Sequence, residues 1–183
     1  MAQYAIAPAA KALAQKQVIE SIDKYQPAQN KGACIRSEDF EGGVIPAGWG
    51  IGPQVEQQDD NTGVGLGTFV DAWVVGTAAD ANNGGYFTIP DAPAGNLFAY
   101  ANDDGDPCNC DMTNVGLETP SMDFSGLTEM AVSFRGYVND NFGGDDGAVE
   151  VSTDGGTTYT MVAPIISVET AWQNLVVDLS AYD

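Results

Sequence analysis

The chain has 183 residues, of which 26 are acidic, six are basic and none is histidine, so its formal net charge at pH 7 is −20. This balance excludes nucleic acid as a partner, because a phosphate backbone is bound by clustered lysines and arginines. It also opposes binding to an anionic membrane surface. The lack of histidine excludes Ser-His-Asp and Cys-His catalysis and zinc sites that use imidazole.

The charge changes sign along the chain near residue 36. Residues 1–36 contain five of the six basic side chains and two acids, whereas residues 37–183 contain 24 acids and one basic residue, Arg135. This step predicts an N-terminal extension or linker over residues 1–36 and one acidic domain over residues 37–183. No apolar run approaches the roughly 20 residues of a membrane-spanning helix, so we expect no membrane insertion.

The N-terminal extension contains the one helix that the sequence predicts. Over residues 8–25, Ala14, Val18, Ile22 and Tyr25 follow the helical period, and Pro27 ends the pattern. This helix could pack on its own domain, link it to an upstream segment or bind a partner.

From residue 37 onward, short alternating apolar and polar segments replace the helical period. Turns rich in Gly, Pro, Asp and Asn separate these segments, as is typical of antiparallel strands. The predicted fold is therefore all-β, an antiparallel β-sandwich (jelly roll) with one N-terminal helix. The expected strands are residues 37–41, 66–75, 85–89, 97–101, 115–119, 129–138, 147–153, 158–166 and 172–179.

Acidic residues gather in three segments near strand ends. Asp39 and Glu41 flank Phe40, and an extended strand would direct both carboxylates to one face while Phe40 enters the core. Residues 102–111 contain four acids, and residues 139–146 contain three. Such loops either stay solvated or bind a hard cation such as Ca²⁺, which prefers oxygen ligands.

Paired carboxylates also raise the possibility of glycoside hydrolysis, which needs two acids at a set separation. With 26 acids in the chain, some pairs reach that separation by chance. Nothing in the sequence marks one pair as buried, so we expect no catalytic activity.

The segment 152–159, S-T-D-G-G-T-T-Y, is similar to an Asp-box, the hairpin that recurs in sialidase propellers. One copy cannot build a propeller. Because Asp-Gly-Gly between two alternating strands favours a hairpin, we interpret the segment as a structural turn.

Aromatic and cysteine residues add two further expectations. Trp49, Trp73 and Trp172 could stack on sugar rings; Trp73 is expected in the core, and Trp49 near the surface as a ligand-binding residue. A disulfide from Cys34 to the loop of Cys108 and Cys110 would fit an exported protein, and unbridged buried thiols are the alternative.

Several motifs occur in an informative order. Residues 40–49 read F-E-G-G-V-I-P-A-G-W, residues 117–127 read L-E-T-P-S-M-D-F-S-G-L, and residues 149–156 read V-E-V-S-T-D-G-G. Trp172 precedes V-D-L-S-A-Y at residues 177–182, and an acidic segment covers residues 136–145. In this order the motifs resemble those of bacterial MAM-like jelly rolls, the choice-of-anchor J and cleaved-adhesin domains.

The resemblance implies a calcium-stabilised jelly roll in a secreted or outer-surface-attached bacterial protein, of the kind often delivered by type IX secretion. Such domains often serve in cell adhesion or accompany a protease. Carried over by position, the metal-ligand candidates are Glu41, Asp103, Asp104 and Asp140, followed by Asp39, Asp145 and Asp146.

In that family further strands follow the D-L-S-x-Y segment, whereas this chain stops at Asp183. We therefore expect a domain without its last strands, whose open sheet edge would permit self-assembly. The expected function is a non-catalytic adhesion or interaction module with structural Ca²⁺, which binds a protein or a glycan at the cell surface. The alternatives are a carbohydrate-binding accessory domain of a secreted hydrolase and a surface-polymer subunit completed by strand donation.

Overall fold

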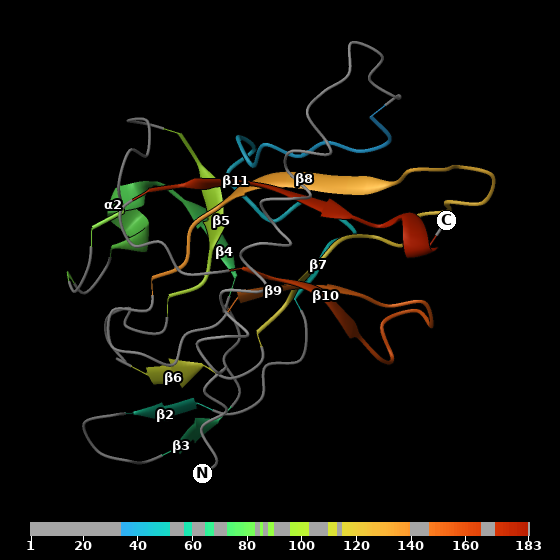
Figure 1. The fold of residues 1–183 in the computed structure, drawn as a ribbon. Helices are drawn as coiled ribbons and strands as arrows, with labels where there is room; N and C mark the ends of the chain where they lie inside the picture. The colour runs from blue at the N-terminus through green and yellow to red at the C-terminus, as the bar shows by residue number, and fades with distance from the viewer. Residues whose placement is uncertain are drawn as a thin grey trace, which may run out of the picture. The chain divides into compact units, whose positions relative to one another are not determined.

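The structure is a computed structural model that describes residues 34–51, 57–59, 65–67, 73–82, 85, 88–89, 96–102, 110–112, 115–139, 147–165 and 171–182. Most of its regular elements are short strands in antiparallel pairs, with one short α-helix (Figure 1), so the predicted all-β class is confirmed. The helix expected over residues 8–25 lies outside the described residues. No helix in the described ranges is long and apolar enough to cross a membrane.

The chain divides into two compact units, and the first comprises residues Ile35–Ser121. Its strands are only two or three residues long and form three separate antiparallel sheets. The pairs are β1 (Gly50–Ile51) with β7 (Leu117–Glu118), β2 (Gln57–Asp59) with both β3 (Gly65–Gly67) and β6 (Cys110–Met112), and β4 (Val74–Gly76) with β5 (Phe98–Tyr100).

A four-residue helix, α2 (Ala78–Ala81), follows β4 and is absent from the elements that the sequence predicts. Thr77 caps it reciprocally: its hydroxyl accepts the backbone N–H of Asp80, while its own N–H donates to the Asp80 carboxylate at 2.8 Å. This capping box satisfies N–H groups that a helix start leaves unpaired. Ala81 is buried, and Asn102 donates to its carbonyl at 2.8 Å, which attaches the helix to the end of β5.

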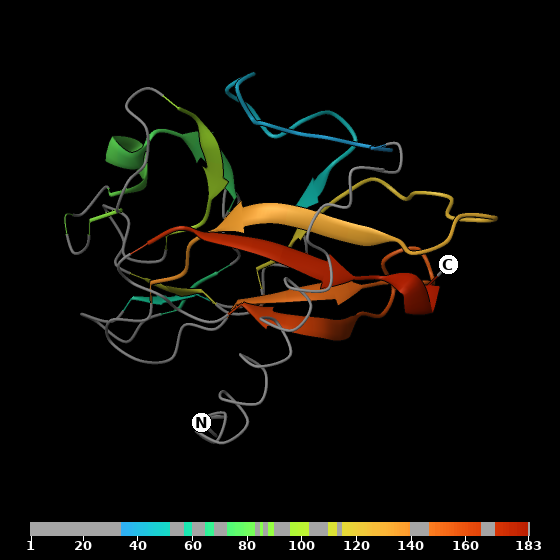
Figure 2. The ribbon, with the colours of Figure 1, turned by 45° about the horizontal axis from the view of Figure 1, so that its top comes forward.

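The second unit contains the described residues from Met122 onward. Strand β8 (Ala131–Gly136) pairs with β11 (Gln173–Asp178), strand β9 (Gly147–Val151) pairs with β10 (Thr160–Ile165), and a 3₁₀ turn, η1 (Ser180–Tyr182), follows β11. In Figures 1 and 2 the β9–β10 pair lies on one side of the β8–β11 pair. A β-carbon at Gly147, the first residue of β9, would lie 3.0 Å from the Val138 side chain, so the start of β9 packs closely against the segment after β8.

The β8–β11 ladder has one buried face and one exposed face. Exposure alternates along β8, and Phe134 and Val132 lie opposite Leu175 and Val177 in the register. Leu175 and Val177 are 4% and 7% exposed, and Leu179 just beyond the strand is 8% exposed. A β-carbon at Gly136 would lie 3.0 Å from the Leu175 side chain, so this face is closely packed.

Strand prediction was most accurate in this second unit and least accurate near residue 40. Each of the last four strands falls within its expected range, whereas residues 37–41 form no strand and the prediction there was wrong. Phe40 has φ = 60°, which no extended strand contains. Residues 85, 88 and 89 carry no strand either, while β1, β2 and β6 were not predicted.

Leu175→Ala should lower the free energy of unfolding by about 2–5 kcal/mol, because it removes a buried side chain and leaves a cavity in a packed face. Asn174→Ala, one residue away on the exposed face, should change it by at most about 0.5 kcal/mol. Urea unfolding followed by fluorescence measures both. Equal losses in the two variants would contradict the assignment of the buried face.

Candidate functional site

The first part of the candidate site is a turn at residues 38–43, where the sequence placed a strand. Glu38 accepts the N–H of Phe40 at 2.8 Å, and Asp39 accepts the N–H of Glu41 at 3.1 Å. The carbonyl of Phe40 then accepts the N–H of Gly43 at 3.0 Å. These bonds stabilise the left-handed backbone of Phe40, which costs a non-glycine residue energy.

Glu41 connects this turn to a distant segment. One of its carboxylate oxygens accepts the N–H of Leu97 at 3.2 Å, 56 residues along the chain, just before β5. The packing is close as well, since a β-carbon at Gly43 would lie 3.7 Å from Leu97. Glu41 therefore holds two segments of the first unit together.

Asp39 and Glu41 fit a Ca²⁺ ion by donor type, because each keeps a second carboxylate oxygen beyond the one that accepts a backbone N–H. Two carboxylates are fewer than the six to eight oxygen ligands that calcium takes. Over the described ranges, no three acidic or thiol side chains gather in a way that could hold a metal ion. The remaining predicted ligands, Asp103, Asp104, Asp140, Asp145 and Asp146, lie outside those ranges, so the calcium site stays a prediction.

The predicted ligand-binding residue Trp49 is half-buried. Its ring packs edge-on against Phe40, with ring centroids 5.6 Å apart, and its indole N–H is buried without a hydrogen-bond partner. Trp73, which the sequence places in the core, is half-buried as well, and its indole N–H donates to the carbonyl of Val115 at 3.2 Å. Both tryptophans thus contribute packing to the first unit.

The cysteine predictions stay open. Cys34 is exposed, Cys110 begins β6 without a described side chain, and Cys108 lies outside the described residues.

The Asp-box-like segment forms a self-contained turn between β9 and β10. Asp154 accepts the N–H groups of Thr157 and Thr158 at 3.0 and 2.9 Å and the hydroxyls of Ser152 and Thr158 at 2.8 and 2.6 Å. Gly155 and Gly156 both have positive φ, as a tight turn requires. The geometry agrees with the interpretation of this segment as a structural turn.

Several other carboxylates of the described loops serve backbone groups in the same way. Asp80 accepts at the start of α2, Asp123 accepts the N–H of Ser125 at 2.9 Å, and Asp178 accepts the N–H of Ser180 at 2.9 Å. Hydrogen bonds from Thr77, the backbone bond first, lower the pKa of Asp80, and those from Ser125, the side-chain bond first, lower the pKa of Asp123. These acids hold turns in place.

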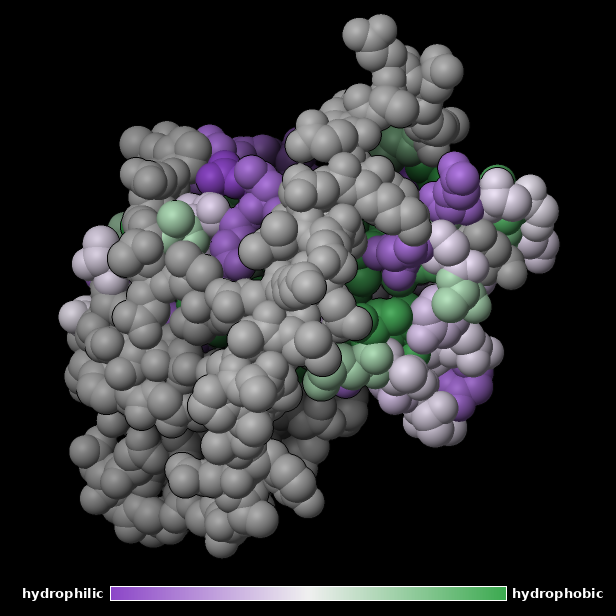
Figure 3. Space-filling view, viewed as in Figure 1, coloured by the Kyte–Doolittle hydropathy of each residue, from purple (hydrophilic) through white to green (hydrophobic). Residues whose placement is uncertain are grey.

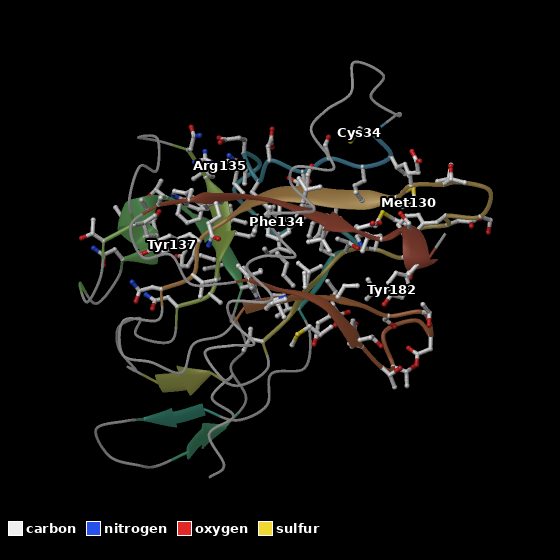
Figure 4. All side chains as sticks on the ribbon, viewed as in Figure 1. Cys34, Met130, Phe134, Arg135, Tyr137 and Tyr182 are labelled. Atoms are coloured by element: carbon white, nitrogen blue, oxygen red, sulfur yellow. The ribbon has the colours of Figure 1, made fainter. Side chains whose placement is uncertain are left out.

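A cluster that the sequence did not predict lies at one end of the β8–β11 ladder. The Arg135 guanidinium carbon is 5.5 Å from the ring centroid of Trp172, and the Tyr137 ring is 5.9 Å from the same ring, tilted by 41°. Arg135 and Phe134 lie on opposite sides of β8 (Figure 4), as the alternation of the strand requires. We call Arg135, Tyr137, Trp172 and the facing Asn174 the outer-face cluster.

Exposed apolar side chains are also present in the second unit. Figure 3 shows apolar as well as polar residues at the surface, and the large exposed apolar side chains of this unit are Met122, Leu127, Tyr159 and Met161. None of them belongs to β8 or β11, and the outer face of that ladder combines the polar Ser133, Arg135 and Asn174 with the part-buried Val176 opposite Ser133.

Comparison with known proteins finds no matching family model, no matching curated protein and no matching solved structure.

Asp154 makes a testable contribution to acid stability. Hydrogen bonds, first that of the Thr158 side chain and then that of its backbone, lower the pKa of Asp154 from 3.8 to about 2. Because the folded pKa is the lower one, this stabilisation is complete above pH 4 and is lost as the pH falls from about 4 to about 2. Asp154→Asn should therefore melt lower at neutral pH and show a shallower decline in melting temperature across that window.

Melting temperatures measured by circular dichroism at a series of pH values check this expectation. Glu150→Gln, on the adjacent strand β9, removes the same charge and serves as the control. An Asp154→Asn profile parallel to that of the wild type across the acid window would contradict the role of Asp154.

Proposed function

We propose that this protein is a non-catalytic, calcium-stabilised interaction module of an exported bacterial surface protein. The main support is the use of carboxylates in the described loops: Asp39, Asp80, Asp123 and Asp154 accept backbone N–H groups of their own turns, and Glu41 accepts one from a distant segment. Acids used in this way have a structural role, which supports a non-catalytic module.

Two grounds support the calcium in this proposal: the negative charge of the domain and the resemblance to calcium-stabilised jelly rolls. A domain with 24 acids and one basic residue gains stability when a cation neutralises its acidic loops. Asp39 and Glu41 remain ligand candidates, as do the predicted ligands of the other two acidic loops. A bound ion would reduce the repulsion among the acids of the loop that holds it.

The jelly-roll arrangement, export and attachment to the bacterial surface rest on the order of the motifs between residues 40 and 182. The antiparallel pairs β8–β11 and β9–β10 are compatible with such a sandwich. In the proposed setting the module binds a protein or a glycan at the cell surface. The exposed face of the β8–β11 ladder contacts this partner.

Removal of calcium tests the proposal. EGTA should lower the melting temperature, and an excess of Ca²⁺ should restore it, because a ligand of the folded state at about 100 times its Kd adds about 2.7 kcal/mol of stability. The control is Mg²⁺ at the same ionic strength, which binds poorly in flexible all-oxygen sites. An identical melting temperature in EGTA and in Ca²⁺ would contradict the proposal that Ca²⁺ stabilises the folded protein.

A further inference from the structure

The outer face of the β8–β11 ladder carries polar side chains in direct register. Arg135 and Asn174 face each other across the two strands, and both are exposed. Ser133, two residues before Arg135 on the same face, is exposed as well. Three hydrogen-bonding side chains thus lie side by side on a rigid ladder.

Arg135 is unusual in this chain. It is the single basic residue among residues 37–183, which contain 24 acids. Within the part of the chain that the structure describes, no carboxylate forms an ion pair with it, and its contact is instead the Trp172 ring at 5.5 Å. Arg135 is thus an exposed guanidinium with no carboxylate partner among the described residues, and it can donate to an anionic group from outside.

The aromatic side chains orient the guanidinium. A guanidinium above an indole ring is attracted to its π face, which restricts the side chain and leaves the N–H edge to act as a donor. Tyr137 packs beside Trp172, and its hydroxyl accepts a hydrogen bond from the Asn139 amide at 3.2 Å. Tyr137 and Trp172 therefore act as positioning residues that also supply an apolar border.

We propose that the outer-face cluster binds an acidic sugar, namely a uronic acid unit of a glycan. The Arg135 fork binds the sugar carboxylate in a bidentate manner, the geometry that suits a guanidinium. Asn174 and Ser133 hydrogen-bond to ring hydroxyls, and the border of Tyr137 contacts the apolar side of the ring. This assignment rests on the proposed function, because it names the partner of the proposed interaction module.

The chemistry of the face favours a sugar over a peptide. A peptide-binding surface is expected to offer large exposed apolar side chains, and those of the described residues in this unit (Met122, Leu127, Tyr159 and Met161) are not part of β8 or β11. The apolar Val176 on this face is part-buried. A uronic acid combines the carboxylate that Arg135 selects with hydroxyls for Asn174 and Ser133. Salt screens exposed charges that lie more than about 8 Å from a bound carboxylate, the Debye length at physiological salt.

Calorimetry with a matched pair of ligands tests the proposal on the full chain in the presence of Ca²⁺. The acidic probe is a trisaccharide of one glucuronic acid on xylobiose, and its neutral counterpart is xylotriose. The wild type should bind the acidic trisaccharide saturably and xylotriose at least tenfold more weakly, because loss of a charge-assisted bidentate contact costs roughly this factor or more.

Variants then locate the binding site. Arg135→Gln should weaken binding of the acidic trisaccharide roughly tenfold or more, and Asn174→Ala roughly fivefold. Arg36→Gln, which removes the other arginine of the chain and thus the same charge, should leave binding unchanged. Arg135→Lys keeps a cation above Trp172 but lacks the paired N–H donors of a guanidinium, so it should bind the acidic trisaccharide with intermediate affinity. Such a result would show that the weaker binding of Arg135→Gln reflects a lost contact and not a loss of folding.

Four outcomes would overturn the assignment: no binding of the acidic trisaccharide, equal binding of xylotriose, equal loss in Arg135→Gln and Arg36→Gln, or equal binding of an acetylated Glu-Ser-Gly peptide. Failure of the proposed function has different signatures, namely cleavage of the trisaccharide during incubation or a melting temperature insensitive to EGTA. A calcium-sensitive protein that binds no acidic sugar would overturn this inference alone.

Discussion

The antiparallel pairing of β8 with β11 determines what the second unit can bury and what it can present. Because direct partners in such a ladder share a face, the register that buries Leu175 opposite Phe134 also places Arg135 opposite Asn174 on the exposed side. A shift of one residue would exchange the two faces. The packed face and the outer-face cluster therefore depend on the same hydrogen-bond register.

Acidic side chains stabilise turns in this protein. A net charge of −20 opposes compaction through self-repulsion, and ordering the backbone of each turn costs conformational entropy. At several described turns, a carboxylate accepts an N–H two to four residues away, and Glu41 accepts one 56 residues away. Part of the negative charge is thus placed where it stabilises the backbone.

The sequence predicted the second unit well because its strands are five or six residues long and two of them, β8 and β9, alternate clearly, as in β8 with Val132 and Phe134 on one face. In the first unit, β1 and β7 have two residues each, which is too short for a period to be visible. The error at Phe40 has a specific cause. An apolar residue between two acids imitates an alternating strand, but Glu38 and Asp39 instead accept N–H groups of the following residues and favour a turn.

The candidate site was predictable only in part. Asp39 and Glu41 stood out as an acidic pair, yet the bond from Leu97 to Glu41 joins segments with no local signal. Arg135 and Trp172 were each visible in the sequence, the first as an isolated basic residue and the second as a candidate for stacking on sugar rings. Their contact required the strand register, which alternation alone does not define.

Nuclear magnetic resonance of the arginine side chains tests most directly whether the outer face of the β8–β11 ladder is the binding surface. The chain contains two arginines, so the Nε–Hε signal of Arg135 is assigned by its persistence in Arg36→Gln. On titration with the acidic trisaccharide, the account predicts a saturable shift of the Arg135 signal and a stationary Arg36 signal. A stationary Arg135 signal at ligand concentrations that saturate the protein would contradict it.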